Sequence, residues 1–172
     1  RIFKNEDRLL IPSRKVKTYD SVPEMSAFKI ENKAEELLSS QRYDFILINF
    51  ANPDMVGHTG DFDATVKAVK TTDKCLSKLV PIAQENDYTV LITADHGNAE
   101  QKLYPDGSVC TAHTTNDVPF VLISENRNIK LKNGALYNIA PTILKIMNMK
   151  KPKEMGKGLM DEKLFIAKDI NN

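Results

Sequence analysis

Three histidines are the residues of this chain best suited to chemistry, and each lies in a polar segment beside a predicted buried strand. They are His58, His96 and His113. Ligands of an open parallel sheet bind outside the carboxyl ends of its strands, so all three imidazoles are candidates for one site. Neutral imidazole is a common ligand of transition metals, which makes metal-assisted chemistry the first possibility to examine.

An aspartate precedes the first histidine by four residues. If this stretch is helical, Asp54 and His58 project the same way and offer a carboxylate oxygen and an imidazole nitrogen to a common centre. The alternative is that Asp54 caps a helix while His58 is a solvated loop residue. This segment alone favours neither interpretation.

A second pair, Asp95-His96, directly follows the predicted strand 88–93, and Gly97 allows a sharp backbone turn behind it. The alternative here is a turn formed by the aspartate and the glycine, with an exposed imidazole between them. His113 lies just before the next predicted strand and could reach the same edge of the sheet. This third histidine favours the ligand interpretation.

Two aspartates and three imidazoles form a mixed oxygen and nitrogen set that suits Mn²⁺, Zn²⁺ or related ions. Five ligands are too many for one catalytic ion with an open position and too few for two complete sites. The natural division is a nearly filled site of Asp54, His58 and His113, beside a second site begun by Asp95 and His96.

Two divalent ions would carry more positive charge than the two aspartates offset, so the cluster would attract a phosphate-like anion. Paired metals stabilise both the attacking and the leaving oxygen of an in-line displacement, which predicts phosphoryl or sulfuryl transfer. The nucleophile could be water, or a serine or threonine that takes the group covalently. The chain has neither a P-loop nor a Rossmann glycine fingerprint.

Buried strands that alternate with amphipathic helices are expected to position these residues. This order predicts an α/β fold, a mostly parallel sheet with helices on both faces, in one compact unit. The segments before residue 23, where 9–11 is at best a brief strand, and after residue 150 are expected to be irregular. Strands are expected at 45–50, 88–93 and 118–123, and helices from 23–26 to about 41, from 61 to a kink or end at Pro81, and over 137–147.

The composition describes one ordinary domain able to bury a core. The chain has 172 residues, 24 basic and 23 acidic side chains, and 41% hydrophobic residues. Dispersed charge gives no sign of a nucleic-acid or membrane-binding face, and the apolar runs are too short to cross a bilayer. We therefore expect a cytoplasmic protein in which Cys75 and Cys110 are incidental thiols.

Three runs of the sequence closely resemble cofactor-independent (2,3-bisphosphoglycerate-independent) phosphoglycerate mutase, a member of the alkaline phosphatase superfamily. The Asp95-His96-Gly97 triplet alone would indicate only the superfamily, whereas the longer runs in this order are specific to the mutase. The three runs are 49–60, 93–99 and 112–116, and shorter matches lie at 12–20, 23–27, 140–142 and 152–156.

The resemblance implies a monomeric enzyme of glycolysis and gluconeogenesis that interconverts 3-phosphoglycerate and 2-phosphoglycerate through a phosphoserine. It implies two Mn²⁺ ions, with Mg²⁺, Co²⁺ or Zn²⁺ as alternatives. Residues matching Asp54, His58 and His113 would hold one ion, and those matching Asp95 and His96 would hold the other with a further aspartate and the nucleophilic serine.

The resemblance covers only the carboxyl-terminal part of the family's phosphatase-like domain. The nucleophilic serine and the remaining aspartate belong to an amino-terminal segment, and the substrate arginines lie largely in an inserted transferase domain; neither region is in this sequence. The chain starts at Arg1, and we expect an incomplete domain that is inactive and marginally stable alone. Neither Ser13 nor Ser26 is assigned as nucleophile.

Two other functions stay open at this point. One is another metal-dependent phosphatase or phosphomutase of the same superfamily. The other is a non-catalytic metal-binding module derived from a decayed enzyme, although the intact ligand residues speak against decay.

Overall fold

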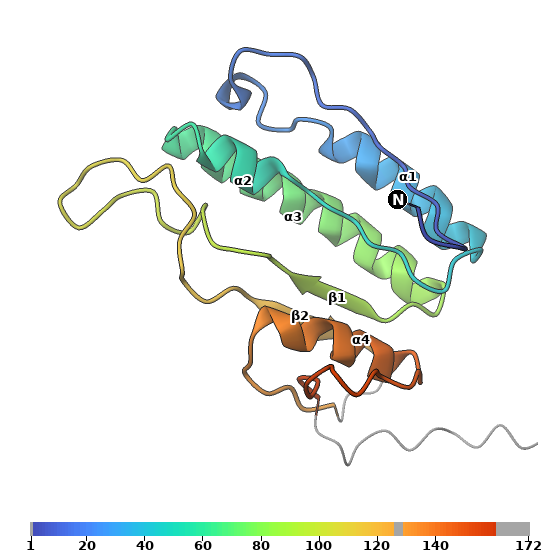
Figure 1. Ribbon diagram of the computed structural model, residues 1–172. Helices are drawn as coiled ribbons and strands as arrows, with labels where there is room; N and C mark the ends of the chain where they lie inside the picture. The colour runs from blue at the N-terminus through green and yellow to red at the C-terminus, as the bar shows by residue number, and fades with distance from the viewer. Residues whose placement is uncertain (1, 126–128, 161–172) are drawn as a thin grey trace, which may run out of the picture. The chain divides into compact units, whose positions relative to one another are not determined.

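The computed structural model describes residues 2–125 and 129–160, and helices make up most of its regular structure (Figure 1). By its internal contacts the chain divides into two compact units, Arg1–Val121 and Leu122–Asn172, where the sequence predicts one. None of the described helices combines the length and the apolar character needed to cross a membrane. The elements are η1 (Tyr19–Ser21), α1 (Ala27–Ser40), α2 (Asn52–Gly57), α3 (Phe62–Glu85), β1 (Val90–Thr93), β2 (Phe120–Ile123), η2 (Leu136–Asn138) and α4 (Ile139–Ile146).

The first unit is built on the long helices α1 and α3, which pack side by side (Figure 1). Ala34 and Leu38 of α1 form one buried cluster with Leu79 and Ala83 of α3. These residues recur at helical spacing, so each helix buries a single stripe. The helix predicted to end near Gln41 is confirmed, because Gln41 adopts the left-handed conformation that terminates α1.

Helix α3 continues through Pro81 to Glu85, so of the two predicted outcomes at the proline, a kink or an end, the end is excluded. A proline removes the hydrogen bond to the carbonyl four residues earlier, which belongs here to Ser77. Both Pro81 and Ser77 are exposed, and water can therefore reach the freed carbonyl. Leu79 and Ala83, on either side of the proline, remain buried against α1, and this packing holds the helix together.

The prediction of a strand at 45–50 is wrong. This segment pairs with no neighbouring strand within the described part of the chain. Its side chains alternate: Ile46 and Ile48 pack on the α1 and α3 cluster, whereas Phe45 is 50% and Leu47 83% exposed. A continuous apolar run indicates burial but cannot supply the hydrogen-bonded partner that defines a strand. The exposed apolar face supports the expectation that this chain is marginally stable alone. The segment 9–11 also forms no strand.

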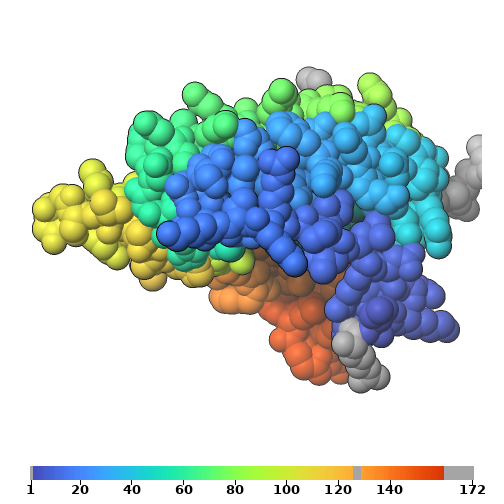
Figure 2. Space-filling view, turned by 90° about the horizontal axis from the view of Figure 1, so that it is seen from above, coloured from blue at the N-terminus to red at the C-terminus, as the bar shows by residue number. Residues whose placement is uncertain are grey.

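The other two predicted strands are confirmed. They form at Val90–Thr93 and Phe120–Ile123 and are hydrogen-bonded neighbours. Pro119 directly precedes β2, where a missing backbone donor is tolerated. The connection between the strands includes a turn closed by the Leu103 and Val109 bridge. Figure 2 shows this part of the chain, in yellow, projecting beyond the helices of its unit.

The second unit contains α4, which confirms the last predicted helix and carries Pro141 in its first turn. Thr142 is fully buried; its hydroxyl donates to the Asn138 carbonyl (2.7 Å) and accepts from the Leu159 N–H (2.8 Å). The chain after residue 150 is irregular as far as residue 160, apart from a bridge between Leu131 and Met160. Residues 161–172 of the predicted irregular tail lie outside the described residues.

We expect Thr142→Val to loosen the second unit, because valine leaves the buried Leu159 N–H without an acceptor. The expected cost is about 1 to 3 kcal/mol. Hydrogen exchange of the Leu159 amide measures it directly and should become faster by at least about fivefold, since about 1.4 kcal/mol corresponds to a tenfold change. Thr72→Val is the matched control, since the Thr72 hydroxyl only donates to the Ala68 carbonyl within α3 (3.3 Å). Unchanged protection of Leu159 would contradict the assigned role.

Candidate metal centre

Helix α2 sets the spacing of the first two candidate ligands. Pro53 lies in its first turn, and the buried Asn52 amide anchors it by donating to the carbonyls of Pro23 (2.8 Å) and Glu24 (2.7 Å). The helical turn places His58 Nε2 3.1 Å from Asp54 Oδ1, as the four-residue spacing predicts. Ala51 is the N-cap residue, so Asp54 is not the helix cap.

Three potential ligand atoms converge at this point. His113 Nε2 lies 3.1 Å from Asp54 Oδ1 and 3.1 Å from His58 Nε2, so all three separations among these atoms are equal. At metal to ligand distances of about 2.1 Å, ligands at angles of about 90° to 109° lie roughly 3.0 to 3.4 Å apart. The spacing of these three atoms therefore fits one divalent ion.

The hydrogen bonding of His58 also fits a metal ligand. His58 Nδ1 lies 2.6 Å from the Thr111 carbonyl oxygen, which can only accept, so Nδ1 carries the proton. In the neutral ring, Nε2 then presents a lone pair to Asp54 and His113. A single proton can bridge only two of the three atoms, whereas a cation can be bound by all three. A backbone carbonyl on the second ring nitrogen is typical of histidines that bind metals.

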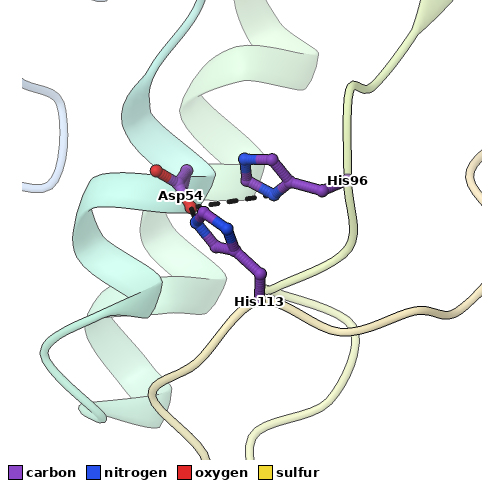
Figure 3. Close-up of side chains that lie close together, drawn as sticks. All are labelled: Asp54, His96 and His113. Atoms are coloured by element: carbon purple, nitrogen blue, oxygen red, sulfur yellow. Dashed lines mark ion pairs between the residues drawn. The ribbon is translucent and has the colours of Figure 1, made fainter.

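His96 lies beside this group and Asp95 lies outside it. The His96 ring stacks on the His113 ring with 3.6 Å between centroids, and His96 Nδ1 is 4.0 Å from Asp54 Oδ1 (Figure 3). Asp54, His96 and His113 offer ligand atoms that all lie within 4.8 Å of one another. Asp95 is 88% exposed and approaches the group through His96 Nε2, 3.6 Å away. The division of these five residues between two ions stays a prediction.

A bridge between two loops fixes the relative positions of His96 and His113. Their neighbours Gly97 and Thr114 pair, with the Thr114 N–H donating to the Gly97 carbonyl (2.9 Å). A Cβ atom at Gly97 would overlap the side chains of Thr114 and Glu100, so this close approach requires glycine.

Glu100 holds the same two loops together and was missed by the sequence analysis. It accepts from the Asn98 N–H (2.7 Å), the Asn116 amide (3.0 Å) and the Thr114 hydroxyl. Burial opposes ionisation of Glu100, but these hydrogen bonds outweigh it and hold the pKa of Glu100 below its ordinary value. A glutamate among small polar residues carries no pattern that distinguishes it from a surface residue.

We expect Glu100→Ala to destabilise the chain by about 1 kcal/mol near neutral pH, because the mutation removes a charged acceptor from three donors, while water can replace part of each bond at this exposed side chain. The pKa of Glu100 is lowered on folding, so its contribution is present above the unfolded pKa of about 4.3 and is lost as the pH falls through the folded value. Urea unfolding at pH 7 and at successively lower pH measures this difference. Glu85→Ala, at the exposed end of α3, is the control. Equal unfolding midpoints for wild type and Glu100→Ala at pH 7 would contradict the role.

Comparisons with known proteins agree with the resemblance noted in the sequence. A family model described as the metalloenzyme superfamily matches residues 1–151. The chain is 50% identical over 159 residues to the 2,3-bisphosphoglycerate-independent phosphoglycerate mutase of Parabacteroides distasonis, covering 92% of this chain and 31% of that protein. It is 53% identical over 159 residues to the mutase of the same name from Clostridium kluyveri, covering 91% of this chain and 31% of the relative.

A solved structure shows the same fold. The chain superposes on the phosphoglycerate mutase of Leishmania mexicana, crystallised at low cobalt concentration, with a TM-score of 0.80 and 28% identity over 88% of this chain and 31% of that one. The predicted fold, an incomplete α/β domain of the alkaline phosphatase type, is thus confirmed. The chain spans about a third of the length of these relatives. Since the family model covers most of its residues, the chain belongs to the metalloenzyme superfamily.

Proposed function

We propose that this chain is the carboxyl-terminal part of the phosphatase-like domain of a 2,3-bisphosphoglycerate-independent phosphoglycerate mutase. The observation that carries the proposal is the convergence of Asp54, His58 and His113, each 3.1 Å from the others, in a chain about 50% identical to mutases of that name. The relatives are about three times as long, so the amino-terminal segment and the transferase domain would come from the rest of the protein.

The proposed cofactors are two Mn²⁺ ions. Asp54, His58 and His113 would hold the first, while Asp95 and His96 would contribute to the second with an aspartate and a serine outside this sequence. The donor set of carboxylate oxygens and imidazole nitrogens supports a divalent ion, as does the cobalt present with the Leishmania mexicana relative. When bound, such ions lower the effective pKa of the attacking serine and offset negative charge on the transferring phosphoryl group.

The residues of this chain orient the ligands. The Thr111 carbonyl keeps His58 in the tautomer that presents the Nε2 lone pair to the ion. The hydrogen bonds of Glu100 and the Gly97 to Thr114 bridge hold the loops of His96 and His113 together. The proposed reaction interconverts 3-phosphoglycerate and 2-phosphoglycerate through a phosphoserine on the missing serine. Its proposed setting is a monomeric cytoplasmic enzyme of glycolysis and gluconeogenesis, and the two unpaired cysteines, both buried, agree with a reducing compartment.

The test is an assay of the complete protein with 3-phosphoglycerate, a divalent metal and no 2,3-bisphosphoglycerate. We expect 2-phosphoglycerate to form, and a chelator to stop its formation. Release of inorganic phosphate instead would favour another phosphatase of the superfamily. Metal binding without either product would favour a non-catalytic module. The isolated 172-residue chain should be inactive.

A further inference from the structure

A buried lysine, Lys102, lies next to the candidate metal centre, although it is not one of the proposed ligands. Lys102 is 7% exposed, and among the described residues no carboxylate lies within ion-pair distance of its ammonium group. Burial lowers the pKa of Lys102 below its ordinary value. A buried cation without a direct counter-ion is costly, so its partners deserve a functional explanation.

Lys102 has two carbonyl partners. Its ammonium donates to the Gly57 backbone carbonyl at the end of α2 (2.7 Å) and to the side-chain oxygen of Asn98 (2.8 Å). The Asn98 side chain in turn donates from Nδ2 to Asp54 Oδ1 (2.8 Å). Asp54 Oδ1 is the same oxygen that faces His58 and His113. Hydrogen bonds thus connect Lys102, through one amide, to the proposed ligand atom.

The orientation of the Asn98 amide is determined from both sides. An ammonium group can only donate, so the amide oxygen must face Lys102, and a carboxylate can only accept, so the amide nitrogen must face Asp54. Asn98 is 4% exposed, which leaves little room for water to replace either partner. A flipped amide would place oxygen against carboxylate and NH₂ against ammonium.

The backbone of α2 is shaped to admit this arrangement. A Cβ atom at Gly57 would overlap the Asn98 side chain and would lie 3.3 Å from Lys102 Nζ. Glycine at this position therefore lets both side chains approach the helix that carries Asp54. The second bond of Lys102, to the Gly57 carbonyl, ties the same helix end to the loop after His96.

We propose that Lys102 is a positioning residue, which fixes the Asn98 amide so that this amide orients the metal-binding oxygen of Asp54. The inference rests on the proposed function in one respect only, that Asp54 binds a divalent ion. Partners that orient a metal ligand typically contribute about 10- to 100-fold to metal affinity. Lys102 would make this contribution through Asn98 without contacting the ion.

The test is a double-mutant cycle for Mn²⁺ binding by the complete protein. The variants are Lys102→Met, which keeps the length of the stem but removes the donors, Asn98→Leu, and the double mutant. We expect each single variant to bind Mn²⁺ about 10- to 100-fold more weakly, and the double mutant to bind no more weakly than Asn98→Leu. A residue that only stabilises the fold would give losses of affinity that multiply.

Lys78→Met is the matched control. Lys78 forms ion pairs with Glu31 (2.8 Å) and Glu35 (3.1 Å) between α3 and α1, so its loss should lower the unfolding midpoint but leave Mn²⁺ affinity within about twofold of wild type. Circular dichroism of every variant at the titration temperature shows whether it is folded. If Lys102→Met is unfolded, Asn98→Leu alone decides, because the inference requires that amide to support Mn²⁺ binding.

Two results would overturn the inference in different ways. Wild-type affinity in Lys102→Met and Asn98→Leu, when the unchanged protein binds Mn²⁺, contradicts the positioning role and leaves the proposed function intact. Absence of Mn²⁺ binding by the unchanged, folded protein contradicts the metal site itself, and the positioning role is then lost with it.

Discussion

Replacing Asp54 with alanine is expected to weaken Mn²⁺ binding by more than about 100-fold. Asp54 Oδ1 lies 3.1 Å from both His58 Nε2 and His113 Nε2, and it is the one anionic atom of the converging three. Loss of an outer partner of a metal ligand already costs about 10- to 100-fold, so loss of the charged ligand itself should cost more. Titration of Mn²⁺ by isothermal calorimetry, or by the spin resonance of the free ion, measures this loss.

Asp73→Ala is the control for the Asp54 experiment. Asp73 is an exposed carboxylate of α3, and its removal changes the net charge of the chain by the same amount. We expect this variant to bind Mn²⁺ as the wild type does. If Asp54→Ala and Asp73→Ala bind equally well, general charge attraction accounts for the binding and the assigned site does not.

Replacing His113 with alanine is expected to lower the mutase activity of the complete protein by at least about 100-fold. The imidazole supplies one of the three converging atoms and also stacks on His96, so its loss disturbs both proposed ion sites. Groups that stabilise developing charge in a transition state contribute about 100- to 1000-fold to the rate, which gives the lower bound. The rate of 2-phosphoglycerate formation from 3-phosphoglycerate measures the effect.

For His113→Ala, an activity assay with excess Mn²⁺ distinguishes the loss of a metal ligand from the loss of the fold. A variant that has lost a ligand but keeps its fold should recover part of its activity at high Mn²⁺ concentration. Asp106→Ala, in the exposed turn of the same connection between β1 and β2, should retain wild-type activity. Wild-type activity in His113→Ala would remove this histidine from the site.

The sequence correctly predicts those elements that a local pattern of apolar residues is sufficient to determine. Helices α1 and α3 each bury a stripe of regular spacing, and Gln41 ends α1. The segment 45–50 fails because its apolar residues do not supply a hydrogen-bonded neighbour. The sequence leaves a kink or an end open at Pro81, and the helix does not end there because the packing of Leu79 and Ala83 outweighs one lost backbone bond.

In the candidate site, too, the sequence predicts the contacts that follow from spacing along one helix but not those that depend on the tertiary fold. The four-residue spacing of Asp54 and His58 is sufficient to place them together once α2 is helical. The stacking of His96 on His113 depends instead on a bridge between distant loops, which spacing along the chain does not encode. Asn98 and Lys102 carry no sequence signal at all, because their roles appear only when both lie against Gly57.

The most direct measurement is the anomalous scattering of manganese in crystals of the complete protein grown with Mn²⁺. The account predicts a peak within about 2.3 Å of Asp54 Oδ1, His58 Nε2 and His113 Nε2. Manganese bound elsewhere, with these three side chains left without a metal, would contradict it.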